Sequence, residues 1–322
     1  MTNLLIIGCG NVGSRHLQGA ILANKKLNIS IVEPNKISII KAKRRISELK
    51  KVKLKKVLFY KSIKNIKENI DIVIVATNSI NRKKIIEEII NRKKIKFLIL
   101  EKVVCQSIYD FNQIIKKTKK HKVKTWVNCP YRTLTVFKSL KKNNKKSLLT
   151  MNVDGNFNLA SNLIHYLDLF SYLSSDYKLK LNYENIDNKI YKSKRKGFVE
   201  LSGNLSFNTS KGDILSIADC KKTMRPTVVN FSYKDSRLIL FESENSAIIQ
   251  NKKNNWKWKK IHNPISYQSF ITKKLLESII VSDECNLIKL EDSYKLHKSM
   301  FKIFQKNISL INNKKTNYCN IT

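Results

Sequence analysis

The segment that most constrains the fold of this chain is Gly8-Cys9-Gly10-Asn11-Val12-Gly13, close to its first residue. A continuous apolar run, Leu4 to Ile7, precedes the segment, as expected for a strand buried on both faces of a parallel sheet. Residues 14–24 follow with the apolar spacing of a helix. In such a strand, turn and helix, the first glycine permits a tight turn, the second lets the backbone approach a pyrophosphate, and the third lets helix and strand pack closely. The segment therefore predicts a dinucleotide-binding turn.

An acidic residue stands where a turn of this kind needs one. A second short apolar run, Ile29 to Val32, ends in Glu33, which lies 20 residues beyond Gly13. A carboxylate at the end of the second strand accepts hydrogen bonds from the ribose hydroxyls of an adenosine. It also repels a 2′-phosphate, so the sequence favours NAD(H) over NADP(H), a preference that Lys36 and the basic composition weaken.

Strand-like and helix-like segments alternate throughout residues 1–128. Further apolar runs indicate strands at 57–60, 71–76, 96–100 and 125–128. Amphipathic stretches indicate helices at 37–49, 82–91 and 111–117. This alternation is typical of an α/β fold with a doubly wound parallel sheet. We therefore predict a Rossmann domain over residues 1–128 that binds NAD(P).

The second half of the chain has a different pattern. A helix is expected at 162–173, and short alternating segments with turn signals between them run from 198 to 261. Two amphipathic helices, at 268–280 and 290–308, close the chain. The pattern predicts an α+β domain over residues 129–322 with an open, mostly antiparallel sheet. No Gly/Ser-rich or Pro-rich linker separates the halves, so we expect a tight junction near residue 130.

The net charge is unusually positive, because 63 Lys and Arg face 24 Asp and Glu, which gives +39. Such a charge raises the hypothesis of a nucleic-acid partner. Only nine of the basic residues are Arg, however, and Arg is favoured for base readout and bidentate phosphate contacts. The excess Lys occurs with abundant Ile and Asn along the whole chain, which indicates a compositional bias. We predict no specific nucleic-acid partner, and expect the charge to draw anionic ligands.

Metal sites and membrane segments are not expected. The six cysteines form no CxxC pair and have no regular spacing with His, so neither a metal site nor a disulfide framework is predicted. No segment approaches the about 18 apolar residues of a membrane span, and the first apolar run is too short for a signal peptide. We expect a cytoplasmic protein without a membrane partner.

Five segments of the sequence together resemble one family, the glucose-fructose oxidoreductases and inositol dehydrogenases known as Gfo/Idh/MocA. They are, in order, IIGCGNVGSRH, VEPN, DIVIVATNS, LEKVV and NLIHYLDLF. The resemblance implies a Rossmann domain followed by a domain whose open sheet supports the substrate and often mediates homo-oligomer formation. It also implies hydride transfer between a nicotinamide and a hydroxyl-bearing carbon, usually of a sugar, a sugar derivative or a cyclitol.

The resemblance implies roles for individual residues at three places. The residues that match the phosphate loop and the ribose acid are Gly8, Gly10, Asn11, Val12, Gly13 and Glu33. Those that match the residues at the nicotinamide end of the cofactor are Thr77, Asn78, Glu101 and Lys102. Those that match the substrate site are Arg132, Asn162, His165 and Asp168.

Three of these residues are the catalytic candidates. A neutral imidazole accepts a hydroxyl proton near neutral pH, so His165 is the candidate base. Lys102 would stabilise negative charge on the reacting oxygen. Asp168, three residues beyond His165 on a helix, would bind substrate or orient the imidazole. Each has a structural alternative: His165 as a core histidine, Lys102 as one surface lysine among many, and Asp168 as a cap or surface ion pair. His16 is interpreted as packing within the first helix.

Two positions depart from the family pattern. Val103 follows Lys102 where the family usually has proline, and Ser161 stands four residues before His165 where many members have aspartate. Two functions therefore stay open. The first is an NAD(P)-dependent oxidoreductase acting on a sugar, a sugar derivative or a nucleotide sugar, for example in the biosynthesis of a bacterial surface polysaccharide. The second is a catalytically inactive protein of the same fold that binds a cofactor or a sugar.

Overall fold

The computed structural model describes residues 1–49, 55–144 and 147–322, which form two compact units. The first unit comprises Met1–Pro130 and Ser266–Glu291, and the second comprises Tyr131–Ile265 and Asp292–Thr322. The sequence predicted one boundary, after residue 128, with residues 266–291 in the second domain. Their contacts place them in the first unit instead. Short 3-10 turns lie at Ile63–Asn65, Pro130–Thr133 and Lys252–Asn254.

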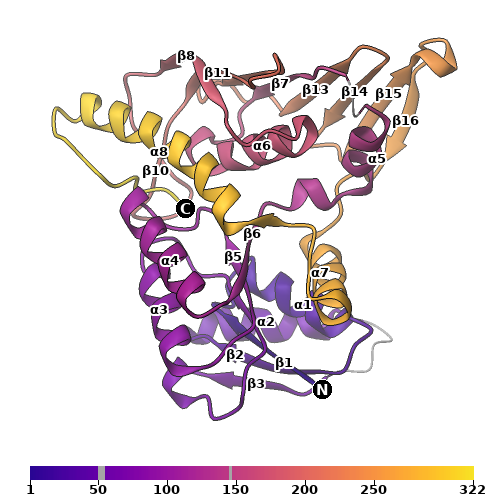
Figure 1. The fold of residues 1–322 in the computed structure, drawn as a ribbon. Helices are drawn as coiled ribbons and strands as arrows, with labels where there is room; N and C mark the ends of the chain where they lie inside the picture. The colour runs from indigo at the N-terminus through magenta and orange to yellow at the C-terminus, as the bar shows by residue number, and fades with distance from the viewer. Residues whose placement is uncertain (50–54, 145–146) are drawn as a thin grey trace. The chain divides into compact units, whose positions relative to one another are not determined.

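A seven-stranded sheet forms the centre of the first unit (Figure 1). In spatial order its strands are β17 (Ile288–Lys289), β6 (Lys124–Asn128), β5 (Phe97–Glu101), β4 (Ile72–Val75), β1 (Thr2–Ile7), β2 (Leu27–Val32) and β3 (Val57–Tyr60). All neighbouring strands run parallel except β17 beside β6. Leu4 to Ile7 of β1 are at most 3% exposed, which explains the unbroken apolar run in the sequence.

Helices cover both faces of this sheet. α1 (Gly13–Leu22) packs against α2 (Lys36–Ser47) and α7 (Gln268–Ser282), whereas α3 (Arg82–Arg92) packs against α4 (Ile108–Lys120). The strand order reverses between β1 and β4, so right-handed crossovers place the two groups of helices on opposite faces, as Figure 1 shows. The predicted Rossmann fold is thus confirmed. A ligand of this fold binds at the carboxyl ends of the strands beside the reversal.

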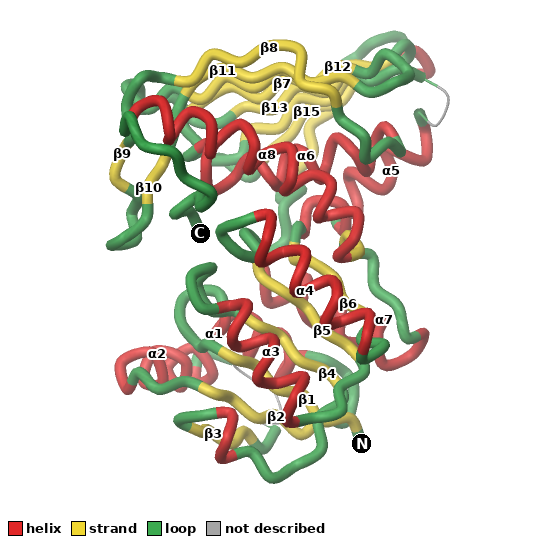
Figure 2. Tube along the Cα trace, turned by 60° about the vertical axis from the view of Figure 1, so that its left-hand side comes forward, coloured by secondary structure: helices red, strands yellow, loops and turns green. Residues whose placement is uncertain are grey.

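An eight-stranded sheet forms the second unit (Figure 2). In spatial order its strands are β16 (Lys259–His262), β15 (Ser246–Asn251), β14 (Ser236–Phe241), β13 (Val228–Tyr233), β7 (Thr150–Gly155), β12 (Ile214–Asp219), β11 (Gly203–Asn208) and β8 (Lys180–Ile186). Only β7 and β12 run parallel; the other pairs are antiparallel. A separate antiparallel pair joins β9 (Tyr191–Lys192) to β10 (Val199–Glu200). The prediction of an open, mostly antiparallel sheet is confirmed.

One face of this second sheet is buried. Along β7, for example, Met151 and Val153 are buried, while Thr150, Asn152 and Asp154 are half-buried. In both views, α6 (Leu159–Ser174) and α8 (Leu290–Ile311) run along one side of the sheet (Figures 1 and 2). α5 (Thr135–Asn143) packs against α6. The alternation of buried and half-buried side chains thus reflects a sheet with helices on one face.

Candidate functional site

The glycine turn joins β1 to α1 at the reversal of strand order. Gly8 has a φ of +86°, which favours glycine, and its N–H donates to the carbonyl oxygen of Val32 at 2.9 Å. A Cβ on Gly13 would lie 1.9 Å from the Gly8 carbonyl oxygen, so the close approach of strand and helix requires glycine. A Cβ on Gly10 would meet no atom within 4 Å. The backbone at Gly10 is therefore open to a phosphate group, and the turn fits a dinucleotide.

Glu33 ties the glycine turn to the end of β2. One carboxylate oxygen accepts the N–H of Cys9 at 2.7 Å, and the other accepts the N–H of Asn35 at 2.9 Å. Burial, together with the charge of Glu33, raises the pKa of the Cys9 thiol to about 12, so the thiol stays protonated. Each carboxylate oxygen can accept a further hydrogen bond, so the expected contact of Glu33 with a ribose stays a prediction.

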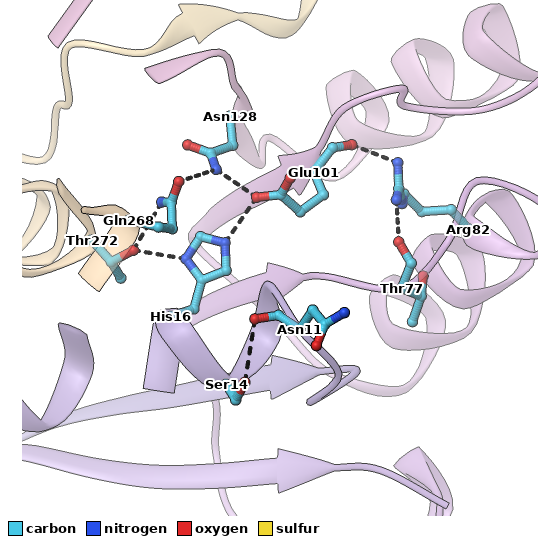
Figure 3. Close-up of polar contacts among 9 residues, drawn as sticks. All are labelled: Asn11, Ser14, His16, Thr77, Arg82, Glu101, Asn128, Gln268 and Thr272. Carbon is cyan, nitrogen blue, oxygen red and sulfur yellow. Dashed lines mark hydrogen bonds and ion pairs between the residues drawn. The ribbon is translucent and has the colours of Figure 1, made fainter. Parts of the chain in front are cut away.

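Two cations of α2 also contact the turn. Lys41 donates to the side-chain oxygen of Asn11, and Arg45 donates to the Asn11 carbonyl oxygen at 2.6 Å and to Ser14 Oγ at 2.5 Å. Ser14 Oγ in turn lies 3.3 Å from the Asn11 carbonyl oxygen (Figure 3). The sequence did not reveal these contacts, because the cations of α2 have no motif that separates them from the many others. Their charge favours an anionic group at this turn.

Five side chains of the first unit form a closed ring of polar contacts (Figure 3). His16 contacts Glu101 through Nε2 and Thr272 through Nδ1, each at 2.8 Å. Asn128 donates to Glu101 at 2.5 Å and to Gln268 at 3.2 Å, and Gln268 donates to Thr272 at 3.1 Å. The ring joins α1, β5, β6 and α7. The interpretation that His16 packs within the first helix was wrong, because its partners lie 85 and 256 residues away in the chain.

Glu101 is held as a carboxylate despite its burial. Burial alone would raise the pKa of Glu101, but His16, the Asn128 amide and the charge of Arg82 together hold it below its ordinary value. Arg82, at 1% exposure, donates to the carbonyl oxygens of Thr77, Glu101 and Val103. Sequence reasoning missed Arg82, whose only signal was its position at the start of the helix after β4.

The structure brings most of the predicted cofactor residues to one edge of the first sheet. Thr77 and Asn78 follow β4, and a Cβ on Gly8 would lie 3.0 Å from the Thr77 N atom. Glu101 ends β5, the strand next to β4, and Lys102 follows it. The peptide bond from Lys102 to Val103 is cis. The glycine turn and the segments after β4 and β5 thus meet at the carboxyl edge where the fold binds its ligands.

Two substrate-site candidates in the second unit are buried against each other. Arg132 and Asp168 form a bidentate pair, with N–O distances of 3.0 and 2.9 Å, and Arg132 also donates to the Tyr177 hydroxyl at 2.9 Å. Burial raises the pKa of Asp168 to about 6, although Arg132 opposes the shift. Asp168 is fully buried and Arg132 is 6% exposed. Their predicted roles toward a substrate stay predictions, and the observed contact is the ion pair.

His165 lies beside a pair of tyrosines that share one carboxylate. The ring centroids of His165 and Tyr131 are 5.7 Å apart. Tyr131 donates to Glu242 at 2.8 Å, and Tyr166 donates to the same carboxylate at 3.1 Å. Burial, reinforced by the charge of Glu242, raises the pKa of both phenols well above the usual value. These phenols therefore stay protonated donors near neutral pH.

A second buried carboxylate, Glu200 of β10, lies at the first turn of α6. Ser161 donates to it through the hydroxyl and, at 3.1 Å, through the backbone N–H. Asn162, in the same turn, donates to the Phe157 carbonyl oxygen at 2.5 Å. The first turn of α6, at the position where an aspartate was expected in many members of the family, thus contacts a carboxylate from 39 residues further along the chain. No motif in the sequence around Glu200 indicated that it contacts the first turn of α6.

Within the described ranges 1–49, 55–144 and 147–322, no group of three or more His, Cys, Asp or Glu side chains is arranged to hold a metal ion. No helix in those ranges is both long and apolar enough to cross a bilayer.

Residues 2–129, within the first unit, match a known protein family. The family described as "Oxidoreductase family, NAD-binding Rossmann fold", GFO_IDH_MocA, matches residues 2–129. Residues 2–129 belong to the Gfo/Idh/MocA family. The predicted family is thereby confirmed over residues 2–129, which contain four of the five sequence segments. No curated protein sequence matches the chain.

Solved structures extend the likeness to nearly the whole chain. An oxidoreductase from Agrobacterium radiobacter in complex with NAD+, L-tartaric acid and magnesium has a TM-score of 0.69 at 12% identity, over 98% of both chains. The UDP-N-acetylglucosamine 3-dehydrogenase GnnA from Acidithiobacillus ferrooxidans has a TM-score of 0.66 at 10% identity, over 94% of this chain and 96% of its own. The transcriptional regulator Gal80p from Kluyveromyces lactis has a TM-score of 0.71 at 13% identity, over 98% of this chain and 93% of its own. At 10–13% identity, the likeness to these structures establishes the fold alone, and it extends that fold to the residues outside 2–129.

Proposed function

We propose that the chain is an NAD(P)-dependent oxidoreductase that transfers a hydride between a nicotinamide and a hydroxyl-bearing carbon of a sugar, sugar derivative or nucleotide sugar. The observation that carries the proposal is the meeting of the open glycine turn, the Thr77 segment and Lys102 at one edge of a parallel sheet. The Gfo/Idh/MocA match over residues 2–129 supports the reaction class. The fold likeness to a UDP-N-acetylglucosamine 3-dehydrogenase supports the choice of a nucleotide sugar. A role in surface polysaccharide biosynthesis and a homo-oligomeric state belong to the same proposal.

The glycine turn and β2 bind the adenosine half of the cofactor in this proposal. The backbone of the glycine turn at Gly10, where an added Cβ would meet no atom within 4 Å, faces the pyrophosphate. Glu33 accepts hydrogen bonds from the ribose hydroxyls with the lone pairs that Cys9 and Asn35 leave available. Its negative charge disfavours a 2′-phosphate, so we propose that NAD(H) is preferred to NADP(H).

Two side chains act on the reacting hydroxyl group in this proposal. The hydride itself is taken up or supplied by the nicotinamide when the cofactor is bound. His165 accepts the hydroxyl proton during alcohol oxidation and returns it during reduction. Lys102 donates a hydrogen bond to the reacting oxygen and stabilises the negative charge that develops there. Asn162 and the Arg132–Asp168 pair belong to the substrate-binding part of the site in this proposal.

The variants Lys102→Ala and His165→Ala test this assignment. We expect turnover to fall by about 10²- to 10⁴-fold in each, while NADH affinity stays within a few-fold. Turnover is measured over a panel of sugars and nucleotide sugars, and NADH affinity by fluorescence titration. Lys94→Ala, at an exposed lysine, serves as the control. Undiminished turnover in both variants would remove the proposed roles.

A second candidate function is that of a catalytically inactive binding protein. Val103 and Ser161, which depart from the family pattern, favour it, and the Gal80p fold likeness shows a transcriptional regulator among similar structures. Calorimetry separates the two functions. NADH binding without turnover over the whole panel would support the inactive protein.

A further inference from the structure

Arg82 links two segments that follow different strands of the first sheet. Its guanidinium donates through Nη1 to the carbonyl oxygen of Glu101, at 2.5 Å, and through Nη2 to the carbonyl oxygen of Thr77 (Figure 3). Nη1 also donates to the carbonyl oxygen of Val103. Thr77 follows β4, whereas Glu101 and Val103 lie at the end of β5 and beyond it. Lys102 stands between two of the three acceptors. One buried cation therefore spans the carboxyl ends of two neighbouring strands.

This link lies beyond the ladder of the sheet. The pairing of β4 with β5 ends at Val75 and Leu100, so Thr77 and Lys102 are outside it. Backbone pairing therefore does not fix the distance between these two segments. The hydrogen bonds of Arg82 connect them at the point where the ladder stops.

The chemistry of the link depends on the planar fork of Arg. A guanidinium carries five N–H donors in a fixed plane, whereas a lysine has one nitrogen on a flexible stem. A lysine at this position could not reach all three carbonyl oxygens with the same geometry. The Glu101 carboxylate provides the opposite charge near the buried guanidinium.

We propose that Arg82 is a positioning residue that fixes the Thr77 and Lys102 segments around the nicotinamide end of the cofactor. This inference rests on the proposed function, which assigns that end of the cofactor to these two segments. None of the three Arg82 acceptors lies in the glycine turn or in β2. Loss of the link should therefore affect the nicotinamide end and leave the adenosine end unchanged.

The test compares NADH with ADP-ribose, which lacks the nicotinamide. In Arg82→Lys we expect the affinity for NADH to fall about 10-fold, the loss expected from a hydrogen bond to a charged group, and the affinity for ADP-ribose to change less than about 2-fold. Arg92→Lys, at the other end of α3 and half-exposed, is the matched control and should change neither affinity. Calorimetry measures both affinities, and thermal unfolding confirms that each variant is folded.

Two outcomes overturn the proposal: an equal loss of both affinities, which a general loss of structure would cause, and no loss of either. If Arg82→Lys does not fold, hydrogen exchange of the wild-type protein decides. NADH should then protect the amides of residues 77–79 and 102–104 more than ADP-ribose does, and equal protection overturns the proposal. A wild-type protein that binds neither ligand contradicts the proposed function itself, which separates that failure from a failure of the Arg82 role.

Discussion

Glu101 stabilises the first unit only in its ionised form. The folded chain lowers its pKa, so the carboxylate contributes stability at pH values above its ordinary pKa of 4.5. This contribution is lost as the pH falls through the lower, folded pKa. The buried guanidinium of Arg82 and the ring contact of His16 then both face a neutral carboxyl group.

Glu101→Gln measures this contribution. The substitution removes the charge and keeps the approximate shape, so we expect it to lower the free energy of unfolding at pH 7 by about 1–3 kcal/mol. The difference from the wild type should shrink as the pH falls below 4.5, because Glu101 then gains a proton in the unfolded chain before it does so in the folded chain. Urea denaturation of both proteins from pH 7 to pH 3.5 checks the prediction. A difference that stays constant over this range would contradict it.

The close approach of α1 and α7 is made possible by Gly19. A Cβ at this position would lie 2.4 Å from the Ser269 carbonyl oxygen and 2.6 Å from Thr272 Cβ. The first of these is a backbone atom, so a rotamer change cannot relieve the contact. Thr272 is also a member of the polar ring, and a shift of α7 would lengthen its contact with His16.

We expect Gly19→Ala to destabilise the first unit. Alanine adds about 1 kcal/mol of helix propensity, but overpacking against a fixed backbone costs about 1–3 kcal/mol, so the net effect is a loss. The control is Gly10→Ala, whose added Cβ meets no atom within 4 Å. Thermal unfolding without cofactor should give a lower midpoint for Gly19→Ala alone. An unchanged midpoint would mean that α7 moves away at no cost.

Local patterns in the sequence predicted the elements better than their partners. The alternation of apolar runs and amphipathic stretches predicted the first sheet, and Gly8, Gly10 and Gly13 predicted the cofactor turn, because each signal lies within a few residues. The amphipathic pattern of 268–280 indicated a helix with an apolar face, but not which unit that face joins. The ring on Glu101 joins two helices and two strands that are far apart in the chain, and Arg82 of α3 contacts segments after two different strands, so neither was predicted.

At the scale of the whole chain, the +39 charge predicts nonspecific binding to polyanions. We expect duplex DNA to bind at 50 mM salt and its affinity to fall by about 10³-fold or more at 200 mM, because binding releases counterions. Two unrelated DNA sequences should bind equally well. Fluorescence anisotropy over a salt series measures both properties. Sequence-selective binding that persists above physiological salt would instead support a nucleic-acid partner.

The division of the first unit between two stretches of chain has a consequence for biosynthesis. Residues 1–130 leave the ribosome before the 135 residues from 131 to 265, and only then does α7 follow. At about 5–20 residues per second, this interval lasts on the order of 10 s. Throughout it, the α7-facing side of α1 is uncovered and the polar ring lacks Gln268 and Thr272. The polar ring on Glu101, at the end of β5, is therefore completed only after α7 has been synthesised.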